Sequence, residues 1–123
     1  MPDTSASPVR VLIVEDDLAA LDVFRDMLED LGATVATASS VVEGRVKLAS
    51  FAPTLVITDV YMPGENGLVM RAEVRHWNPV IPVVALTGAD EAAVSPDAGF
   101  FTILRKPVSM ATLQELLASV PRP

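Results

Sequence analysis

Residues 55–67 read Leu55-Val56-Ile57-Thr58-Asp59-Val60-Tyr61-Met62-Pro63-Gly64-Glu65-Asn66-Gly67, and this stretch decides the fold of the chain. Its first four residues are apolar or β-branched, which is typical of a strand buried on both faces of a parallel sheet. The strand ends in a carboxylate, Asp59, and the proline, asparagine and glycines after it predict a loop. Ligands of open α/β sheets bind beyond the carboxyl ends of the strands, so Asp59 faces a candidate site. Taken alone, Asp59 could equally cap the following turn.

The composition describes one compact domain with an aliphatic core. The chain has 123 residues, of which 50% are hydrophobic and 5% aromatic, and it has no cysteine. Nine basic and sixteen acidic residues give a net charge of −7, which argues against nucleic acid or an anionic membrane as a direct partner. A cation or a basic protein fits this charge better. The lack of cysteine is compatible with a cytoplasmic location, and no apolar run reaches membrane-spanning length.

The hydrophobic patterns along the chain alternate between strand and helix. Short apolar runs predict five strands, at residues 10–14, 34–38, 55–58, 82–86 and 101–104. Helical spacing predicts helices at residues 18–31, from 41 to before 53, at 68–76 and at 109–120, with at most a short helix within 89–99. This alternation predicts one parallel α/β sheet with right-handed crossovers. We expect a domain at residues 9–120, between a flexible N-terminal tail at 1–8 and a C-terminal tail at 121–123.

Polar side chains gather where the predicted strands end. The first strand is followed by Glu15 and Asp16, the third ends in Asp59, the fourth in Thr87, and the fifth is followed by Lys106 after an arginine. Three carboxylates at one edge of a sheet would repel one another and raise their pKa values unless a cation intervenes. Oxygen ligands completed by water suit Mg²⁺ better than Ca²⁺. A divalent ion, a lysine and a hydroxyl around one free carboxylate predict a phosphoryl-transfer site.

Four short motifs stand in this order at the strand ends, and together they resemble a known family. They are Val14-Glu15-Asp16-Asp17, Thr58-Asp59-Val60-Tyr61-Met62-Pro63 with Gly67, Leu86-Thr87-Gly88, and Lys106-Pro107. From Val11 to about Leu117 the chain resembles the response-regulator receiver domains of two-component signalling. The resemblance implies a flavodoxin-like, doubly wound, five-stranded parallel sheet in the order 2-1-3-4-5. It also implies a cis bond between Lys106 and Pro107.

The resemblance also implies a role for each site residue. Asp59 would be the phosphoacceptor, and Thr87 and Lys106 would contact the phosphoryl group. Mg²⁺ would be held by the carboxylates of Glu15, Asp16 and Asp59 and by the main-chain carbonyl of Tyr61.

The chain departs from the family pattern at two places. Ile103 stands where many receivers have an aromatic residue three positions before the lysine. Only ten residues, 88–97, separate Thr87 from Ala98, which predicts a shortened fourth helix between the fourth and fifth strands. Because Ile103 is too short to swing between buried and exposed states, we expect residues 88–99 to change order on phosphorylation. With Phe100 and the last helix, this segment would form the partner surface.

The expected function is therefore a phosphoacceptor receiver domain in the cytoplasm. It would take a phosphoryl group from a sensor histidine kinase or phosphotransfer protein and relay the signal through a downstream protein. It would catalyse only its own phosphorylation and dephosphorylation, without contacting nucleic acid or membrane directly; a homodimer is left open. The alternative is a phosphorylation-independent interaction module with a relic acidic site, which Ile103 and the short helix favour mildly.

Several other residues have more than one interpretation. Asp17 is better explained as an N-cap than as a metal ligand, and His76 as surface than as a phosphorelay residue. Arg71 and Arg75 share a helical face that could dock an acidic partner, although a solvated face is the simpler interpretation. Adjacent strand residues point to opposite faces, so one of two neighbouring phenylalanines, 100 or 101, is exposed or fills space beside the short helix.

Overall fold

A computed structural model of the chain describes residues 8–120 and contains one five-stranded parallel sheet in the order β2-β1-β3-β4-β5. The strands are β1 (Arg10–Val14), β2 (Thr34–Ala38), β3 (Leu55–Asp59), β4 (Val83–Thr87) and β5 (Thr102–Arg105). The helices are α1 (Leu18–Asp30), α2 (Val41–Phe51), α3 (Gly67–Trp77), the 3₁₀ helix η1 (Pro96–Ala98) and α4 (Met110–Ser119). The predicted fold class and strand order are confirmed.

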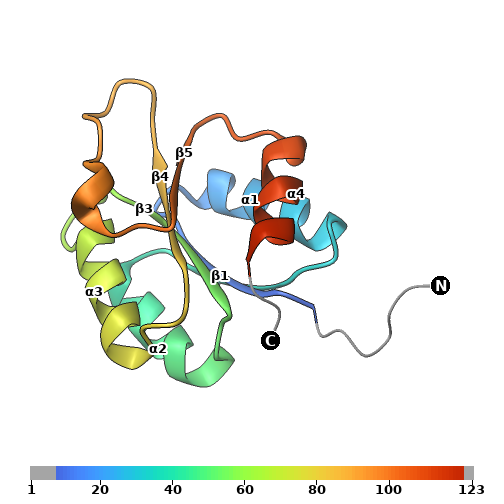
Figure 1. Cartoon of the computed structure of the whole chain (residues 1–123), viewed down its shortest axis with the longest axis horizontal. Coiled ribbons are helices and arrows are strands. Elements are labelled where there is room, and N and C mark those ends of the chain that lie inside the picture. The colour runs from blue at the N-terminus through green and yellow to red at the C-terminus, as the bar shows by residue number, and fades with distance from the viewer. Residues whose placement is uncertain (1–7, 121–123) are drawn as a thin grey trace.

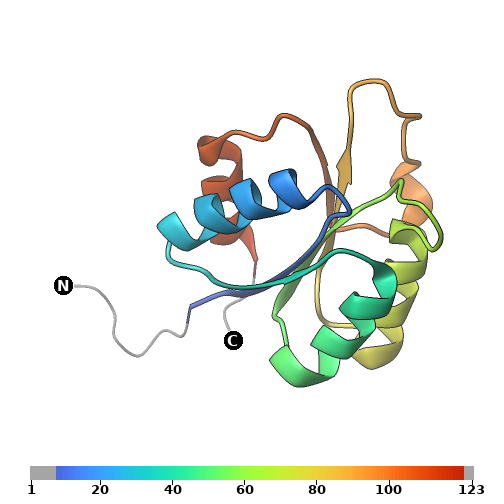
Figure 2. The same cartoon turned by 180° about the vertical axis from the view of Figure 1, so that it is seen from behind.

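Helices cover the sheet on both faces. Helices α1 and α4 lie on one face, while α2 and α3 lie on the other (Figures 1 and 2). Each helical layer packs its own apolar cluster against the sheet, and β3 and β4 are buried along their whole length. This two-sided burial explains why the third and fourth strands have continuous apolar runs instead of alternating patterns.

Polar side chains fix where the helices begin. The Asp17 carboxylate accepts hydrogen bonds from the Ala19 and Ala20 N–H groups, so Asp17 is the N-cap of α1, as predicted. Ser40 caps α2 through the Glu43 N–H, at the predicted capping-box spacing. Each cap satisfies N–H groups that have no partner within the helix, which stops the helix from extending into the preceding loop.

Gly67 brings the start of α3 close to the end of β3. A Cβ atom at Gly67 would lie 2.3 Å from the Asp59 carbonyl oxygen and 2.8 Å from the Cα of Val60. The Gly67 N–H donates a 2.9 Å hydrogen bond to the Val60 carbonyl. Only glycine allows this approach, so Gly67 fixes the loop that presents Asp59.

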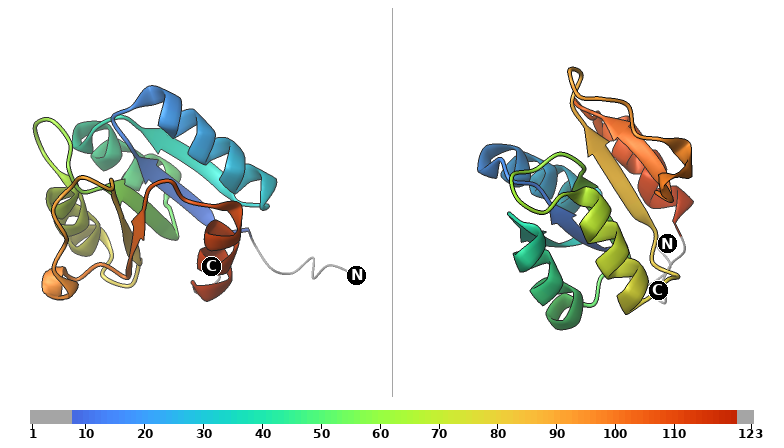
Figure 3. Two further views of the ribbon diagram at one scale, coloured as in Figure 1. Left: turned by 90° about the horizontal axis from the view of Figure 1, so that it is seen from above. Right: turned by 90° about the vertical axis from the view of Figure 1, so that its left-hand side faces the viewer.

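The crossover from β4 to β5 differs from the other three crossovers. Where the sequence predicts a shortened helix, the structure has only η1, three residues long (Figure 3). Residues 89–95 are small or polar without an apolar stripe, and Pro96 occupies the first position of η1. Gly99, at φ 91°, ends the turn. The predicted short helix is therefore this single 3₁₀ turn, because nothing in the segment could bury a longer helical face.

The limits of the predicted domain fall inside the described part of the chain, whereas its tails, apart from Pro8, lie outside it. Among residues 8–120 no helix is both long and apolar enough to span a bilayer.

Candidate functional site

The ends of four strands bring the predicted site residues to one edge of the sheet. Asp59 is the last residue of β3, and Thr87 is the last residue of β4. Main-chain pairing continues beyond the strands: the Glu15 N–H donates to the Ala38 carbonyl at 3.0 Å and the Lys106 N–H to the Thr87 carbonyl at 2.8 Å. The sheet itself therefore fixes the backbone of the site residues.

Three carboxylates form a compact acidic cluster at this edge. One oxygen from each of Glu15, Asp16 and Asp59 lies within 4.8 Å of the other two. Glu15 and Asp59 are 1% and 4% exposed, whereas Asp16 is open to solvent. This oxygen-only donor set, buried on one side and open on the other, fits a hard cation that keeps part of its water. The structure thus brings together the three predicted carboxylate ligands of a magnesium site.

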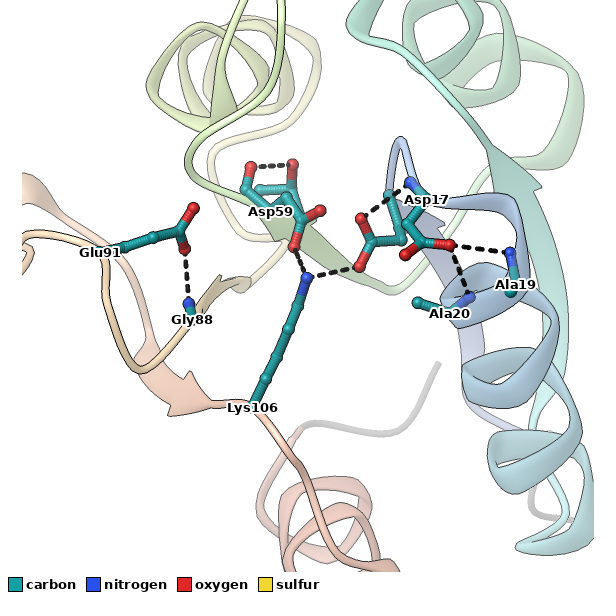
Figure 4. Close-up of polar contacts among 9 residues, drawn as sticks. Asp17, Ala19, Ala20, Asp59, Gly88, Glu91 and Lys106 are labelled. Atoms are coloured by element: carbon teal, nitrogen blue, oxygen red, sulfur yellow. Dashed lines mark hydrogen bonds and ion pairs between the residues drawn. The ribbon is translucent and has the colours of Figure 1, made fainter.

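Lys106 supplies the positive charge at the base of the cluster. Its Nζ lies 2.6 Å from Glu15 Oε1 and 2.8 Å from Asp59 Oδ1 (Figure 4). The Lys106–Pro107 peptide bond is cis, as the resemblance implied. The second oxygen of Glu15 accepts a 3.2 Å hydrogen bond from the Asp17 N–H. Glu15 is therefore held from both sides, by the Lys106 ammonium and by the Asp17 N–H.

The two buried carboxyl groups have pKa values shifted in opposite directions. Burial and the neighbouring Glu15 raise the pKa of Asp59 to about 8, against the lowering effect of Lys106. Burial also raises the pKa of Glu15, but the hydrogen bonds with Asp59, Lys106 and the Asp17 N–H outweigh it, so the pKa of Glu15 lies below its usual value. The predicted repulsion among carboxylates is therefore concentrated on Asp59.

Thr87 presents a hydroxyl group that lacks a protein partner. Its Oγ1 atom is buried and makes no hydrogen bond with the described residues. A buried hydroxyl without a partner is uncommon and costs about 1–3 kcal/mol. Because Thr87 ends the strand next to Asp59, an oxygen-rich group attached to Asp59 could accept this hydrogen bond.

Two contacts to the β4–β5 crossover were not predicted. The Glu91 carboxylate accepts a hydrogen bond from the Gly88 N–H (Figure 4), and the Tyr61 hydroxyl donates one to the Ala92 carbonyl. The sequence offers no signal for either contact, because the conformation of an unpatterned loop follows no period.

The remaining candidate residues lie away from the acidic cluster. His76 and Trp77 are exposed at the C-terminal end of α3, whereas Asp59 lies before the N-terminal end of this helix. Phe100 packs partly buried against the α2–α3 cluster, whereas Phe101 is 48% exposed. The open question about the two phenylalanines is thereby answered.

Comparison with known proteins agrees with this geometry. The family described as "Response regulator receiver domain" matches residues 11–118. The chain is 36% identical over 114 residues to a protein named response regulator MprA from Mycobacterium sp. (strain KMS), covering 90% of this chain and 48% of the relative. It is 37% identical over 112 residues to the alginate biosynthesis transcriptional regulatory protein AlgB of Pseudomonas aeruginosa, covering 89% and 25%. The chain therefore spans half or less of these relatives.

Solved structures show the same fold. A response regulator receiver domain protein from Clostridium thermocellum superposes with a TM-score of 0.81 at 30% identity, covering 89% of this chain and 91% of that one. The chemotaxis protein CheY4 of Vibrio cholerae gives a TM-score of 0.82 at 26% identity, covering 94% and 100%. The fold and the acidic site define a signalling domain of the two-component type. The chain belongs to the response regulator receiver domain family.

Proposed function

We propose that Asp59 accepts a phosphoryl group from a sensor histidine kinase or phosphotransfer protein, in a reaction that needs Mg²⁺. The observation that supports this most directly is the buried Asp59 carboxylate, held 2.8 Å from the Lys106 ammonium and inside the acidic cluster. Burying one carboxylate beside another costs free energy, so this pair indicates a functional site and not a structural one.

Each residue of the site has a proposed role. An Asp59 oxygen attacks phosphorus while the bond from phosphorus to the donor breaks, which leaves an acyl phosphate on the chain. Lys106 pairs with a phosphoryl oxygen, and the free Thr87 hydroxyl donates a hydrogen bond to another. The carboxylates of Glu15, Asp16 and Asp59 and the carbonyl of Tyr61 would hold Mg²⁺. The bound ion would supply positive charge against the phosphoryl oxygens.

The proposed setting follows from the family. The domain would act in the cytoplasm and pass its signal to a downstream protein by direct contact, without binding nucleic acid or membrane itself. It would catalyse no reaction other than its own phosphorylation and dephosphorylation. The complete set of acids, hydroxyl and lysine favours this function over a phosphorylation-independent module.

Phosphorylation can be tested with a small phosphodonor. Incubated with acetyl phosphate and Mg²⁺, the chain should gain the mass of one phosphoryl group, whereas Asp59→Asn should gain none. Asp97→Asn, which removes an exposed acid from η1, is the matched control and should be labelled like the parent. Labelling of Asp59→Asn, or a label mapped to His76, would contradict the assignment.

A further inference from the structure

One face of the edge strand β5 lacks the helix that parallel sheets normally place there. Helices α1, α2 and α3 fill the first three crossovers, whereas the fourth contains only η1. On β5, Leu104 is buried beneath α4, but Ile103 points to the opposite face and is 36% exposed. Parallel sheets are usually covered on both faces, so a layer of helical size is absent on the α3 side of β5.

A groove lies beside α3 next to this uncovered strand. It has a volume of about 260 Å³, and its lining includes Arg71, Arg75, Val80, Gly99 and Phe101. An apolar cavity of ~150 Å³ is large enough to hold benzene, so this groove can receive large side chains. Val80 and Phe101 expose much of their apolar surface at its rim, at 78% and 48%. These exposed side chains provide the apolar contacts that a partner would cover.

The polar part of the groove is positively charged. Arg71 and Arg75 lie one turn apart on α3 and line the groove, whereas Arg105 lies outside its lining, two residues beyond Ile103 at the end of β5. Within residues 8–120 none of these three arginines has a carboxylate oxygen within 4 Å. They are three of only nine basic residues in a chain with sixteen acids, so this cationic region contrasts with the remainder of the protein.

Arg71 shows that this region has unused hydrogen-bonding capacity. Its Nε atom is buried without a hydrogen-bond partner in the described part of the chain. Its guanidinium packs on Gly99, where a Cβ atom would lie 3.0 Å from the nearest guanidinium nitrogen. A fixed guanidinium with an unpaired donor is suited to a carboxylate, which accepts hydrogen bonds from arginine in a two-pronged geometry.

We propose that this groove binds an acidic amphipathic helix of a partner protein, which takes the position left by the absent helix. The apolar side chains of the partner helix would cover Val80, Phe101 and Ile103, and its carboxylates would pair with the arginines. A helix of three to four turns spans ~16–22 Å, enough to cross a strand of this length and reach α3. This proposal does not rest on the proposed phosphorylation of Asp59.

The test uses the full chain and three designed peptides. Each is a 16-residue helix with the same leucine and phenylalanine stripe and no tryptophan, and its polar face is built from Glu, Gln or Lys. Trp77 is the only tryptophan of the chain and lies two residues after Arg75, so its fluorescence reports binding directly. The Glu peptide should bind about tenfold more tightly than the Gln peptide, lose affinity at high salt, and shift the amide resonances of residues 71, 75, 99, 101 and 103.

Variants locate the binding to the groove. Arg71→Gln with Arg75→Gln should weaken binding of the Glu peptide about tenfold, whereas Arg25→Gln with Lys47→Gln removes the same charge elsewhere and should change it little. Val80→Glu, at a highly exposed position, tests the same site without disturbing the partly buried Arg71. Equal affinity for the Glu and Gln peptides would overturn the proposal. So would resonance shifts confined to other elements, or self-association of the chain through this face that excludes the peptide.

Discussion

The hydroxyl of Tyr61 donates a 3.0 Å hydrogen bond to the main-chain carbonyl of Ala92. Tyr61 lies in the loop after β3 and Ala92 lies in the crossover after β4, so this bond joins the loop that follows Asp59 to the crossover that follows Thr87. The side chain is 42% exposed, and its hydroxyl reaches the crossover. This hydrogen bond couples the position of the crossover to Tyr61, which lies two residues after the proposed phosphoacceptor Asp59.

The first prediction separates the ring of Tyr61 from its hydroxyl. If the ring hinders water from reaching a phosphoryl group on Asp59, Tyr61→Asn should lose phosphate faster than the parent, and Tyr61→Phe should lose it at close to the parent rate. Tyr61→Phe should instead accelerate amide hydrogen exchange in residues 88–95, because it lacks the bond to Ala92. The measurements are the decay of phosphorylated mass and exchange by mass spectrometry. Faster phosphate loss from the parent than from Tyr61→Asn would show that the ring gives no protection.

The second prediction concerns Glu91. Its carboxylate accepts a hydrogen bond from the Gly88 N–H and so places negative charge next to Thr87. The oxygens of a phosphoryl group on Asp59 would lie close to this charge. Glu91→Gln keeps an acceptor for the N–H but removes the charge, and should speed phosphorylation by small phosphodonors about two- to fivefold, equivalent to ~0.5–1 kcal/mol of repulsion. Asp90→Asn removes a neighbouring exposed charge and serves as the control. Equal acceleration in both variants would mean that only the overall charge matters.

The third prediction concerns Gly67. Alanine favours a helix over glycine by ~1 kcal/mol, yet Gly67→Ala should destabilise the fold, because its Cβ would clash with the Asp59 carbonyl, 2.3 Å away. It should also reduce phosphorylation by displacing Asp59. Gly44→Ala, on α2, would meet the flexible Met70 side chain instead, and should cost less. Urea denaturation measures the stability of both variants. A Gly67→Ala variant as stable as the parent would show that the loop can move.

The fourth prediction follows from the raised pKa of Asp59. Between its ordinary pKa of 3.8 and about 8, the unfolded chain releases this proton while the folded chain retains it. The contribution of Asp59 to stability therefore falls as pH rises through this range. Without divalent ions, Asp59→Asn should be more stable than the parent at pH 7.5, by ~1 kcal/mol or more, which is ~4 °C in Tm. The difference should vanish near pH 4.

Thermal melting in a chelator at both pH values measures this effect, with Asp97→Asn as the control for a lost surface charge. A variant less stable than the parent at pH 7.5, or an offset independent of pH, would show that Lys106 compensates Asp59 fully.

Local patterns in the sequence were enough to predict most of the fold and the composition of the site. Buried strands have continuous apolar runs, and parallel pairing puts their ends at one edge, so the sequence alone predicts that Glu15, Asp59 and Lys106 lie together. The protonation of the acids could not be predicted, because it depends on how deeply Asp59 is buried and on how closely Glu15 and Lys106 approach it. The contacts of Glu91 and Tyr61 also depend on a loop conformation that no periodic pattern specifies.

The crossover from β4 to β5 has a consequence for protein engineering. Since no long helix within it packs on the sheet, its length is not set by core packing, and doubling a flexible loop costs only ~0.6 kcal/mol. A foreign domain inserted between Ala93 and Val94 would leave Glu91, Ala92 and the Ser95 cap in place. The inserted domain would then be joined beside the Tyr61–Ala92 contact, so the crossover is a position at which a fluorescent reporter could be coupled to events at Asp59.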